Sequence, residues 1–291
     1  RSRGLGDVYK RQDYIAETLK SVLNQTYCDY EVIVVNDSST DNSLEVASSF
    51  QDERIHIYTK ENEGVSAARN YGIMHAKYDY IAFLDADDIW ESDYLECQKK
   101  LIGTYPDAGI YSTAFYSLEK GKRKLRNVLI NEHIHFLVHD YFKESVMNGL
   151  SICWTSSLCL KKEVIKEIPM FRVGIKRGED LDLWLRIALN YDVAYLNLPK
   201  VFYRTGLSDS LTSDYSKNGE FPYYEWFNFT SESSYYRKYV ILVVYIHAKN
   251  AFIHHDYDTC LAELWSVKTI AWRFKWAERL LLLVISWIKS K

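Results

Sequence analysis

The stretch YIAFLDADDIW (residues 80–90) decides the fold, because it joins a short apolar run to a cluster of carboxylates. The apolar part, YIAFL (80–84), is typical of a buried parallel strand. Side chains alternate across a strand, so Asp85 and Asp87 are predicted to leave the strand end on the same side. Two carboxylates this close repel each other unless a cation or protons intervene. Asp85 and Asp87 are therefore candidate ligands of Mg²⁺ or Mn²⁺, which prefer oxygen donors. The alternative is a solubilising acidic loop.

Similar short runs recur on both sides of this stretch and alternate with helical patterns. The pattern predicts an α/β fold with a doubly wound, mostly parallel, Rossmann-like sheet. The carboxyl ends of its strands meet at one edge, so we expect the polar clusters at 36–43, 60–64 and 85–88 to gather there. The other predicted strands are EVIVV (31–35), IHIYT (55–59), AGIYSTAFY (108–116), SLCLK (157–161), VAYLN (193–197) and KVFYR (200–204), and the first helix is predicted to begin at Asp13.

The C-terminal part, residues 221–291, is predicted to be a helical extension. Its last segment (268–291) mixes Trp, Leu and basic residues, which suits an amphipathic helix on a membrane surface. The alternative is a helix packed on the main domain or on a second subunit, as in a homo-oligomer. The apolar run LLLLVISWI (280–288) is too short to span a bilayer.

Composition excludes some classes of partner. Charged residues make up 26% of the chain and the net charge is -3, which argues against nucleic acid as the main partner. The five cysteines are odd in number and form no CxxC pair, so neither a disulfide framework nor a zinc site is indicated. A reducing cytoplasm fits this cysteine usage.

Asp37, at the end of the predicted strand 31–35, is a further candidate. It could cap the next helix, or it could accept a hydrogen bond from a ligand such as the N–H of a base. Asn42 and Glu45 have the spacing of a capping box, which would leave Asp37 free for the second use.

Three charged groups complete the set of candidates, and each has two interpretations. Glu179 and Asp180 begin the helix EDLDLWLRIAL (179–189), where the helix dipole favours anions and where a general base could also sit. Arg69, in EGVSAARN (63–70), could bind a diphosphate or form a surface ion pair. Arg204 lies in YRTGLSDSLT (203–212), where it could contact a diphosphate or be an ordinary solvent-exposed loop residue.

These segments together resemble the family-2 glycosyltransferases of the GT-A fold. The matching pieces are DYIAETLKSVLNQTYCDYEVIVVNDSSTDNS, NEGVSAARNYGI, YIAFLDADDIW and GEDLDLWLRI, and they span roughly residues 13–210. Their order and spacing also match, and the set is more specific than any single motif.

The resemblance implies a role for each candidate residue. Asp37 would contact the nucleotide base, Asp85 and Asp87 would form the Asp-x-Asp metal pair, and Asp180, with Glu179 beside it, would be the catalytic base. The resemblance also places Arg69 near the donor. Arg204, on the loop 203–212, is a candidate contact of the diphosphate.

The implied reaction is metal-dependent, inverting transfer of a sugar from a nucleotide-diphosphate sugar to an acceptor hydroxyl. UDP is the favoured carrier, and Mn²⁺ or Mg²⁺ the expected cofactor. The expected acceptor is a glycan or lipid-linked glycan of cell-surface polysaccharide assembly, in the cytoplasm or at the inner face of the membrane. The alternatives are a non-catalytic nucleotide- or sugar-binding module and an inactive truncated fragment.

The N-terminal segment departs from the family pattern. Members usually begin with an apolar strand, whereas residues 1–12 (RSRGLGDVYKRQ) have no β-branched run and no initiating Met. We expect residues 1–12 to be a foreign or misread segment and residues 13–220 to form the glycosyltransferase domain without its first strand. Because a lost central strand leaves backbone groups unpaired, the chain as written is expected to be unstable or poorly active.

Overall fold

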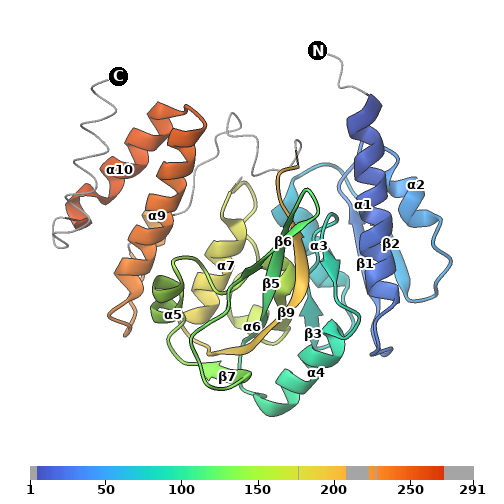
Figure 1. The fold of residues 1–291 in the computed structure, drawn as a ribbon, viewed down its shortest axis with the longest axis horizontal. Helices are drawn as coiled ribbons and strands as arrows, with labels where there is room; N and C mark the ends of the chain where they lie inside the picture. The colour runs from blue at the N-terminus through green and yellow to red at the C-terminus, as the bar shows by residue number, and fades with distance from the viewer. Residues whose placement is uncertain (1–4, 176, 208–222, 227, 272–291) are drawn as a thin grey trace. The chain divides into compact units, whose positions relative to one another are not determined.

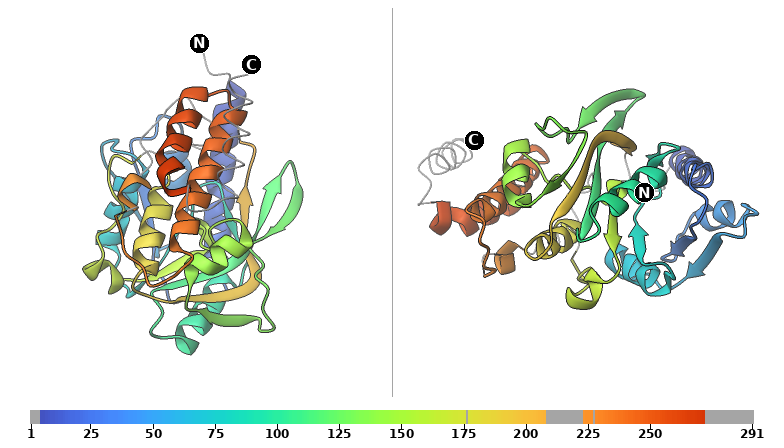
Figure 2. Two further views of the ribbon diagram at one scale, coloured as in Figure 1. Left: turned by 90° about the vertical axis from the view of Figure 1, so that its left-hand side faces the viewer. Right: turned by 90° about the horizontal axis from the view of Figure 1, so that it is seen from below.

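The computed structural model describes residues 5–175, 177–207, 223–226 and 228–271 (Figures 1 and 2). The chain divides into two compact units. The first unit consists of Arg1–Tyr141 and Ile152–Gly206, and the second consists of Phe142–Ser151 and Leu207–Lys291. The division thus follows Gly206, and the short segment 142–151 joins the C-terminal unit.

The first unit alternates strands and helices, as the sequence predicts. Its helices are α1 (Leu5–Leu23), α2 (Ser43–Ser48), α3 (Val65–His75), α4 (Tyr94–Thr104), the 3-10 helix η1 (Thr155–Ser157), α6 (Val164–Glu167) and α7 (Glu179–Ala188). Its strands are β1 (Val32–Asn36), β2 (Ile55–Thr59), β3 (Tyr80–Ala82), β4 (Ile89–Trp90), β5 (Ile110–Glu119), β6 (Lys122–Arg126), β7 (His135–Val138), β8 (Leu158–Lys161) and β9 (Val193–Arg204).

Helix α1 begins earlier than predicted. It starts at Leu5, so Asp13 lies inside the helix and is not its cap. The intervening segment, GDVYKRQ, holds no proline, and most of its residues tolerate a helix well, so nothing in it stops the helix before Asp13. The prediction that the helix starts at Asp13 is therefore wrong.

The strands form two sheets. β1 and β2 pair in parallel and make a two-stranded sheet, beside which α1 and α2 lie in Figure 1. The other strands form a seven-stranded sheet with the order β3-β8-β5-β9-β4, to which β6 adds beside β5 and β7 beside β9. In that sheet β5 and β9 are parallel, and the remaining pairs are antiparallel. The α/β class is confirmed, with more antiparallel pairs than simple strand–helix alternation predicts.

Strand β9 replaces the two short strands predicted at 193–197 and 200–204. Its pairing with β5 shifts register between Leu196 and Pro199, which face consecutive residues of β5. A proline has no N–H to give to the ladder and is tolerated at such an irregularity. The break in the apolar pattern around Pro199 is thus a bulge inside one strand.

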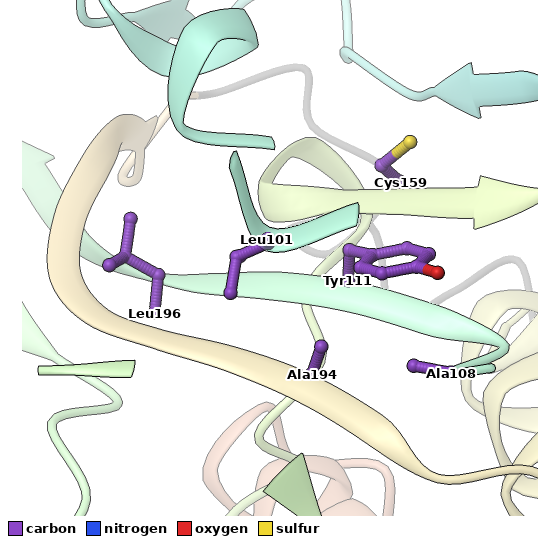
Figure 3. Close-up of a cluster of buried hydrophobic side chains, with 6 residues drawn as sticks. All are labelled: Leu101, Ala108, Tyr111, Cys159, Ala194 and Leu196. Atoms are coloured by element: carbon purple, nitrogen blue, oxygen red, sulfur yellow. The ribbon is translucent and has the colours of Figure 1, made fainter. Parts of the chain in front are cut away.

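A hydrophobic core covers one part of the seven-stranded sheet (Figure 3). Helix α4 packs against β5 and β9 through Leu101, which meets Tyr111 of β5 and Ala194 and Leu196 of β9. A second cluster joins α1 and α4 to the sheet through Val22, Trp90, Tyr94, Phe115 and Val201. These contacts fix the strand ends that carry the candidate site.

Helix α7 packs closely enough on the sheet to require glycine. A Cβ at Gly109 would lie 2.6 Å from Cβ of Tyr191, just beyond α7, so no larger residue fits there without movement. On α7 itself, Trp184 is fully buried and contacts Phe83 and Phe171. The start of α7, with Glu179 and Asp180, is therefore held firmly relative to the sheet.

The second unit is helical, as predicted for the C-terminal part. It contains α5 (Tyr141–Asn148, from its second residue onward), α8 (Tyr223–Trp226), α9 (Tyr236–Ile253) and α10 (Tyr257–Ala271). Phe142 packs edge-on against Tyr236 and Tyr239 of α9, which explains why the segment 142–151 belongs to this unit. The tail predicted to contact a membrane (268–291) lies almost wholly outside the described residues.

Candidate active site

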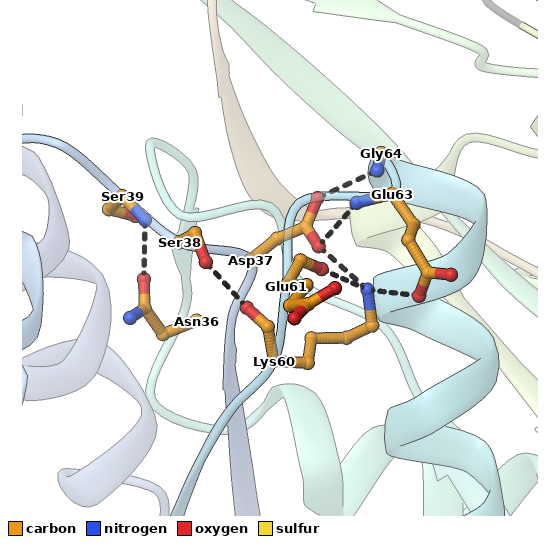
Figure 4. A network of polar contacts seen from close by, with 8 residues as sticks. All are labelled: Asn36, Asp37, Ser38, Ser39, Lys60, Glu61, Glu63 and Gly64. Atoms are coloured by element: carbon orange, nitrogen blue, oxygen red, sulfur yellow. Dashed lines mark hydrogen bonds and ion pairs between the residues drawn. The ribbon is translucent and has the colours of Figure 1, made fainter.

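Asp37 directly follows β1 and accepts three hydrogen bonds from the loop before α3 (Figure 4). Its Oδ1 accepts from Nζ of Lys60 at 2.9 Å and from the backbone N–H of Glu63 at 3.1 Å. Its Oδ2 accepts from the backbone N–H of Gly64 at 2.8 Å. Burial opposes ionisation, but the bonds from Lys60, Glu63 and Gly64 outweigh it and lower the pKa of Asp37. A carboxylate has about four acceptor positions, so these three bonds leave room for one ligand donor.

The predicted capping box at the start of α2 does not form. Asn42 is the cap residue, but its side chain makes no capping hydrogen bond, and its φ of -80° and ψ of 14° are not the extended backbone that capping needs. Instead Oδ1 of Asp41 accepts from the N–H of Ser43 at 3.0 Å. Asp37 does not cap α2 either, because its carboxylate serves the loop before α3.

The loop held by Asp37 sets the direction of α3. Gly64 precedes the helix with φ of 90°, a conformation that favours glycine. Asp37 therefore orients the helix that carries Arg69. Among the described residues, Asp37 connects to the rest of the site through α3 and not through a direct side-chain hydrogen bond.

Arg69 connects two acidic segments that are far apart in the sequence. Its Nη2 donates to Oδ1 of Asp85 at 2.9 Å, and its Nη1 donates to Oε1 of Glu179 at 2.8 Å. The guanidinium also lies over the ring of Phe171, 5.3 Å from its centroid. Burial disfavours the charge, but Asp85, Glu179 and Asp180 outweigh it and raise the pKa of Arg69. The surface-ion-pair interpretation is thus wrong, because the side chain is only 14% exposed.

The turn after β3 is anchored by a buried carboxyl that the sequence analysis did not single out. Asp88 is fully buried, and its Oδ2 accepts from the hydroxyl of Ser156 at 2.5 Å. The same hydroxyl accepts from the N–H of Asp85 at 3.1 Å. Burial, followed by the charges of Asp85 and Asp87, raises the pKa of Asp88 well above its usual range. Ser156 thus ties both ends of the turn to η1.

Arg204, at the end of β9, holds the same turn from the other side. Its backbone N–H donates to Oδ1 of Asp88 at 2.9 Å, and its Nη1 donates to the backbone oxygen of Asp87 at 3.0 Å. Its Nη2 forms an ion pair with Glu17 of α1, and its guanidinium lies over Tyr14. The side chain is 8% exposed, so the prediction of a solvated loop residue is wrong. Its neighbours assign it a structural role, and a diphosphate contact stays a prediction.

Asp180 is held at the start of α7 by two hydrogen bonds. Its Oδ2 accepts from the hydroxyl of Thr155 at 3.0 Å, and its Oδ1 accepts from the N–H of Leu181 at 2.7 Å. Thr155 precedes Ser156 in η1, so one short turn contacts both the 85–88 turn and the start of α7. Gly178, with φ of 70°, allows the chain to enter α7 at this angle.

Glu179 has an unusual protonation equilibrium. Burial, and then the neighbouring charge of Asp180, raise the pKa of Glu179 to about 7, although Arg69 acts in the opposite direction. Its carboxyl therefore gains or loses a proton near neutral pH. Perturbed carboxyls of this kind often occur where catalytic groups are tuned by their surroundings.

The carboxylates of Asp85 and Asp87 have the chemistry that a divalent cation needs. No group of three or more His, Cys, Asp or Glu that could hold a metal occurs within the described part of the chain. Mg²⁺, however, is usually held by one or two carboxylates together with phosphate oxygens of the substrate. The side chain of Asp85 is 35% exposed, and one of its oxygens binds Arg69. The donor set fits a cation shared with a substrate diphosphate, and not a cage built by protein alone.

The structure therefore brings most of the predicted residues together. Arg69 contacts Asp85 and Glu179, and Asp180 is next to Glu179. The residues that the sequence analysis missed are Asp88, Thr155 and Ser156. Asp88 follows Asp87 in the quoted stretch, but its burial depends on Ser156 and Arg204, which no local pattern reveals.

A comparison with protein families identifies the chain. The model of glycosyl transferase family 2 matches residues 7–168, which is more than half of the chain. The chain belongs to glycosyl transferase family 2. This confirms the resemblance inferred from the motifs.

Several glycosyltransferases are similar in sequence. The putative teichuronic acid biosynthesis glycosyltransferase TuaG of Bacillus subtilis is 32% identical over 190 residues, which cover 64% of this chain and 71% of TuaG. Glycosyltransferase GlyG of Streptococcus pneumoniae is 30% identical, covering 68% of each chain. An uncharacterized glycosyltransferase of Rickettsia bellii is 44% identical, but the match covers only 25% of its length. Three other similar glycosyltransferases are matched over only 29% of their length, so this chain corresponds to one part of each of them.

A similar fold is also found among solved structures. TarS of S. aureus, residues 1–349 in complex with UDP-GlcNAc, superposes with a TM-score of 0.69 at 16% identity, covering 87% of this chain and 76% of that one. At this identity the likeness supports the fold alone. Within the described residues, none of the helices has the length and apolar character that crossing a membrane requires.

Proposed function

We propose that the chain transfers a sugar from a nucleoside-diphosphate sugar to an acceptor hydroxyl, with inversion at the anomeric carbon. The observation that carries the proposal is the bridge made by Arg69. It joins Asp85, one of the candidate metal carboxylates, to Glu179, the neighbour of the candidate base Asp180. Groups suited to the leaving diphosphate and to the attacking hydroxyl thus belong to one hydrogen-bonded network.

On the donor side, Asp85 and Asp87 would hold a Mg²⁺ or Mn²⁺ ion that neutralises charge on the departing diphosphate. Asp37 would accept a hydrogen bond from the nucleotide base through its remaining acceptor position. Arg69 keeps the carboxylate of Asp85 in place, since its guanidinium is itself fixed by Glu179 and Phe171.

On the acceptor side, Asp180 would take the proton of the attacking hydroxyl. The acceptor oxygen forms its bond to the anomeric carbon while the diphosphate leaves from the opposite face, which inverts the configuration. Thr155 restrains the carboxylate of Asp180 through Oδ2. A base held in this way is pre-positioned, which is a recognised source of rate enhancement.

Two relatives suggest the donor and the pathway. The TarS structure contains UDP-GlcNAc, which supports a UDP-sugar as donor. The name of TuaG refers to teichuronic acid biosynthesis, which supports a role in assembling a cell-surface polysaccharide.

The test compares wild type with Asp180→Asn. Wild type is incubated with Mn²⁺, a panel of nucleotide sugars and candidate acceptors, and the release of nucleoside diphosphate is measured. We expect Asp180→Asn to lower kcat by at least about 100-fold while donor affinity in calorimetry stays within about twofold. Asp79→Asn is the matched control, because Asp79 is exposed and lies outside the network.

Each outcome has a distinct meaning. Activity of wild type that survives Asp180→Asn would remove Asp180 from the mechanism. Tight donor binding by wild type without turnover on any acceptor would instead identify a nucleotide-sugar-binding module.

A further inference from the structure

The β5–β6 hairpin and the segment after it carry a cluster of exposed cations. Residues 119–134 contain the cations Lys120, Lys122, Arg123, Lys124 and Arg126, against two carboxylates, Glu119 and Glu132. All five cationic residues are exposed. In both views of Figure 2 the green hairpin projects from the seven-stranded sheet. Along β6, Lys122, Lys124 and Arg126 alternate with Arg123 and Leu125, so the hairpin carries cations on both of its faces.

The hairpin has a defined shape. Glu119 of β5 pairs with Lys122 of β6, so the connection is the two-residue loop Lys120–Gly121. Both loop residues have positive φ, 48° and 77°, as a type I′ turn requires. Arg123 lies over the ring of Phe202, 4.6 Å from its centroid, which fixes the hairpin against β9.

Large apolar side chains are exposed next to these cations. Leu125 is 48% exposed, Val128 43%, Ile134 59%, and Ile130 is as exposed as in an extended chain. Single exposed apolar residues are common on soluble proteins, but four within ten residues of a basic hairpin form an unusual combination. We call residues 120–134 the basic–apolar surface.

Val128 and Ile130 are exposed because the backbone between them is held in place by hydrogen bonds. Asn127 and Leu129 are buried, while Val128 and Ile130, which alternate with them, point outward. The N–H of Leu129 donates to Oδ1 of Asn197 at 2.8 Å, and its carbonyl accepts from Nδ2 of Asn197 at 2.8 Å. Because both backbone groups of Leu129 are held by β9, the outward direction of Ile130 is built into the fold.

We propose that the basic–apolar surface binds an anionic lipid bilayer. Lysine and arginine attract the negative headgroups, and each contributes a factor of about five to partitioning near such a surface. The apolar side chains enter the boundary between headgroups and acyl chains, as in other interfacial segments. A soluble polyanion would match the cations but would leave Ile130 and Ile134 in water. An anionic bilayer satisfies both kinds of side chain.

The residues of this surface are different from those of the candidate active site and from the segment 268–291. The surface gives the first unit its own membrane contact, which is useful to an enzyme only if its acceptor is also at the bilayer. The inference itself does not depend on sugar transfer, because vesicle binding is measured without any donor or acceptor.

The experiment measures partitioning of the full chain onto vesicles by sedimentation. Vesicles of phosphatidylcholine alone are compared with vesicles that contain about one-third phosphatidylglycerol. We expect wild type to bind only the anionic vesicles and to bind more weakly as salt is added. Lys122→Glu/Lys124→Glu should lower the partition coefficient by at least about 25-fold, at about fivefold for each lost cation.

A matched control and an apolar variant complete the test. Lys166→Glu/Lys249→Glu makes the same change in net charge at two exposed lysines of helices α6 and α9, and it should reduce binding far less. Ile130→Ser should lower binding by about tenfold through lost apolar burial, with no change in fold because the side chain is exposed.

The contrary results are equally clear. If wild type fails to bind anionic vesicles, or if the hairpin and control pairs lose binding equally, the proposal is wrong. If Ile130→Ser binds like wild type and inorganic polyphosphate binds as tightly as vesicles do, the surface is a polyanion site and not a membrane contact.

Discussion

Replacing Glu179 by Gln should remove a pH dependence from the stability of the protein. In the folded chain, burial and Asp180 raise the pKa of Glu179 from its ordinary value of 4.5 to about 7. Between these values the folded state holds a proton that the unfolded state has released. The free energy of unfolding must therefore fall as pH rises through this window, and the contribution is complete only below about pH 4.5.

The magnitude follows from the size of the shift. Each pKa unit corresponds to about 1.4 kcal/mol, so the loss between pH 4.5 and 7 is about 3 kcal/mol. The amide of Glu179→Gln cannot ionise, but its oxygen can still accept the hydrogen bond from Arg69. We therefore expect the variant to lack this loss and to gain about 3 kcal/mol relative to wild type as pH rises from 4.5 to 7.

The assay is guanidinium unfolding followed by tryptophan fluorescence at a series of pH values from about 4 to 8. The quantity of interest is the free energy of unfolding of the variant minus that of wild type at each pH. Glu163→Gln serves as the control, because its side chain is 66% exposed and solvent screens its charge. Parallel curves for wild type and Glu179→Gln would refute the reasoning, since Glu179 would then titrate alike in both states.

Three further perturbations test the network around the turn. Asp88→Ala should lower the free energy of unfolding by about 3 kcal/mol, because it leaves the buried hydroxyl of Ser156 without its acceptor; chemical denaturation against Asp88→Asn measures this. Thr155→Val should lower kcat about tenfold with little change in donor KM, whereas Thr155→Ser, which keeps the hydroxyl for Asp180, should restore it. Asp87→Ala should weaken donor binding in the presence of Mn²⁺ but not in its absence. If calorimetry showed the same loss of donor affinity under both conditions, Asp87 would not be a metal ligand.

Strands with strong local signals were predictable from the sequence. The β-branched runs at 31–35 and 55–59 correspond to β1 and β2 with boundaries that agree within one residue. β4, with only two residues, and β7, with only four, are too short to give a pattern that can be recognised. Their existence depends on pairing with β9, which is distant in the chain.

The candidate site was predictable in its members but not in its connections. Strand ends and a helix start located Asp37, Asp85 and Asp180 because such positions follow from local pattern. The link through Arg69 spans 110 residues to Glu179, and no local rule contains it. The turn formed by Thr155 and its neighbours was missed for the same reason, since small polar residues after a tryptophan have no distinctive spacing.

The two sheets share no ladder among the described residues. Helix α3 packs on β1, while Arg69 of α3 donates hydrogen bonds to Asp85 and Glu179. If the β1–β2 sheet opens slowly, which amide hydrogen exchange would detect, α3 should shift with it and tilt the guanidinium of Arg69. A softer β1–β2 sheet would therefore lower the turnover number, because Arg69 would hold Asp85 and Glu179 less firmly.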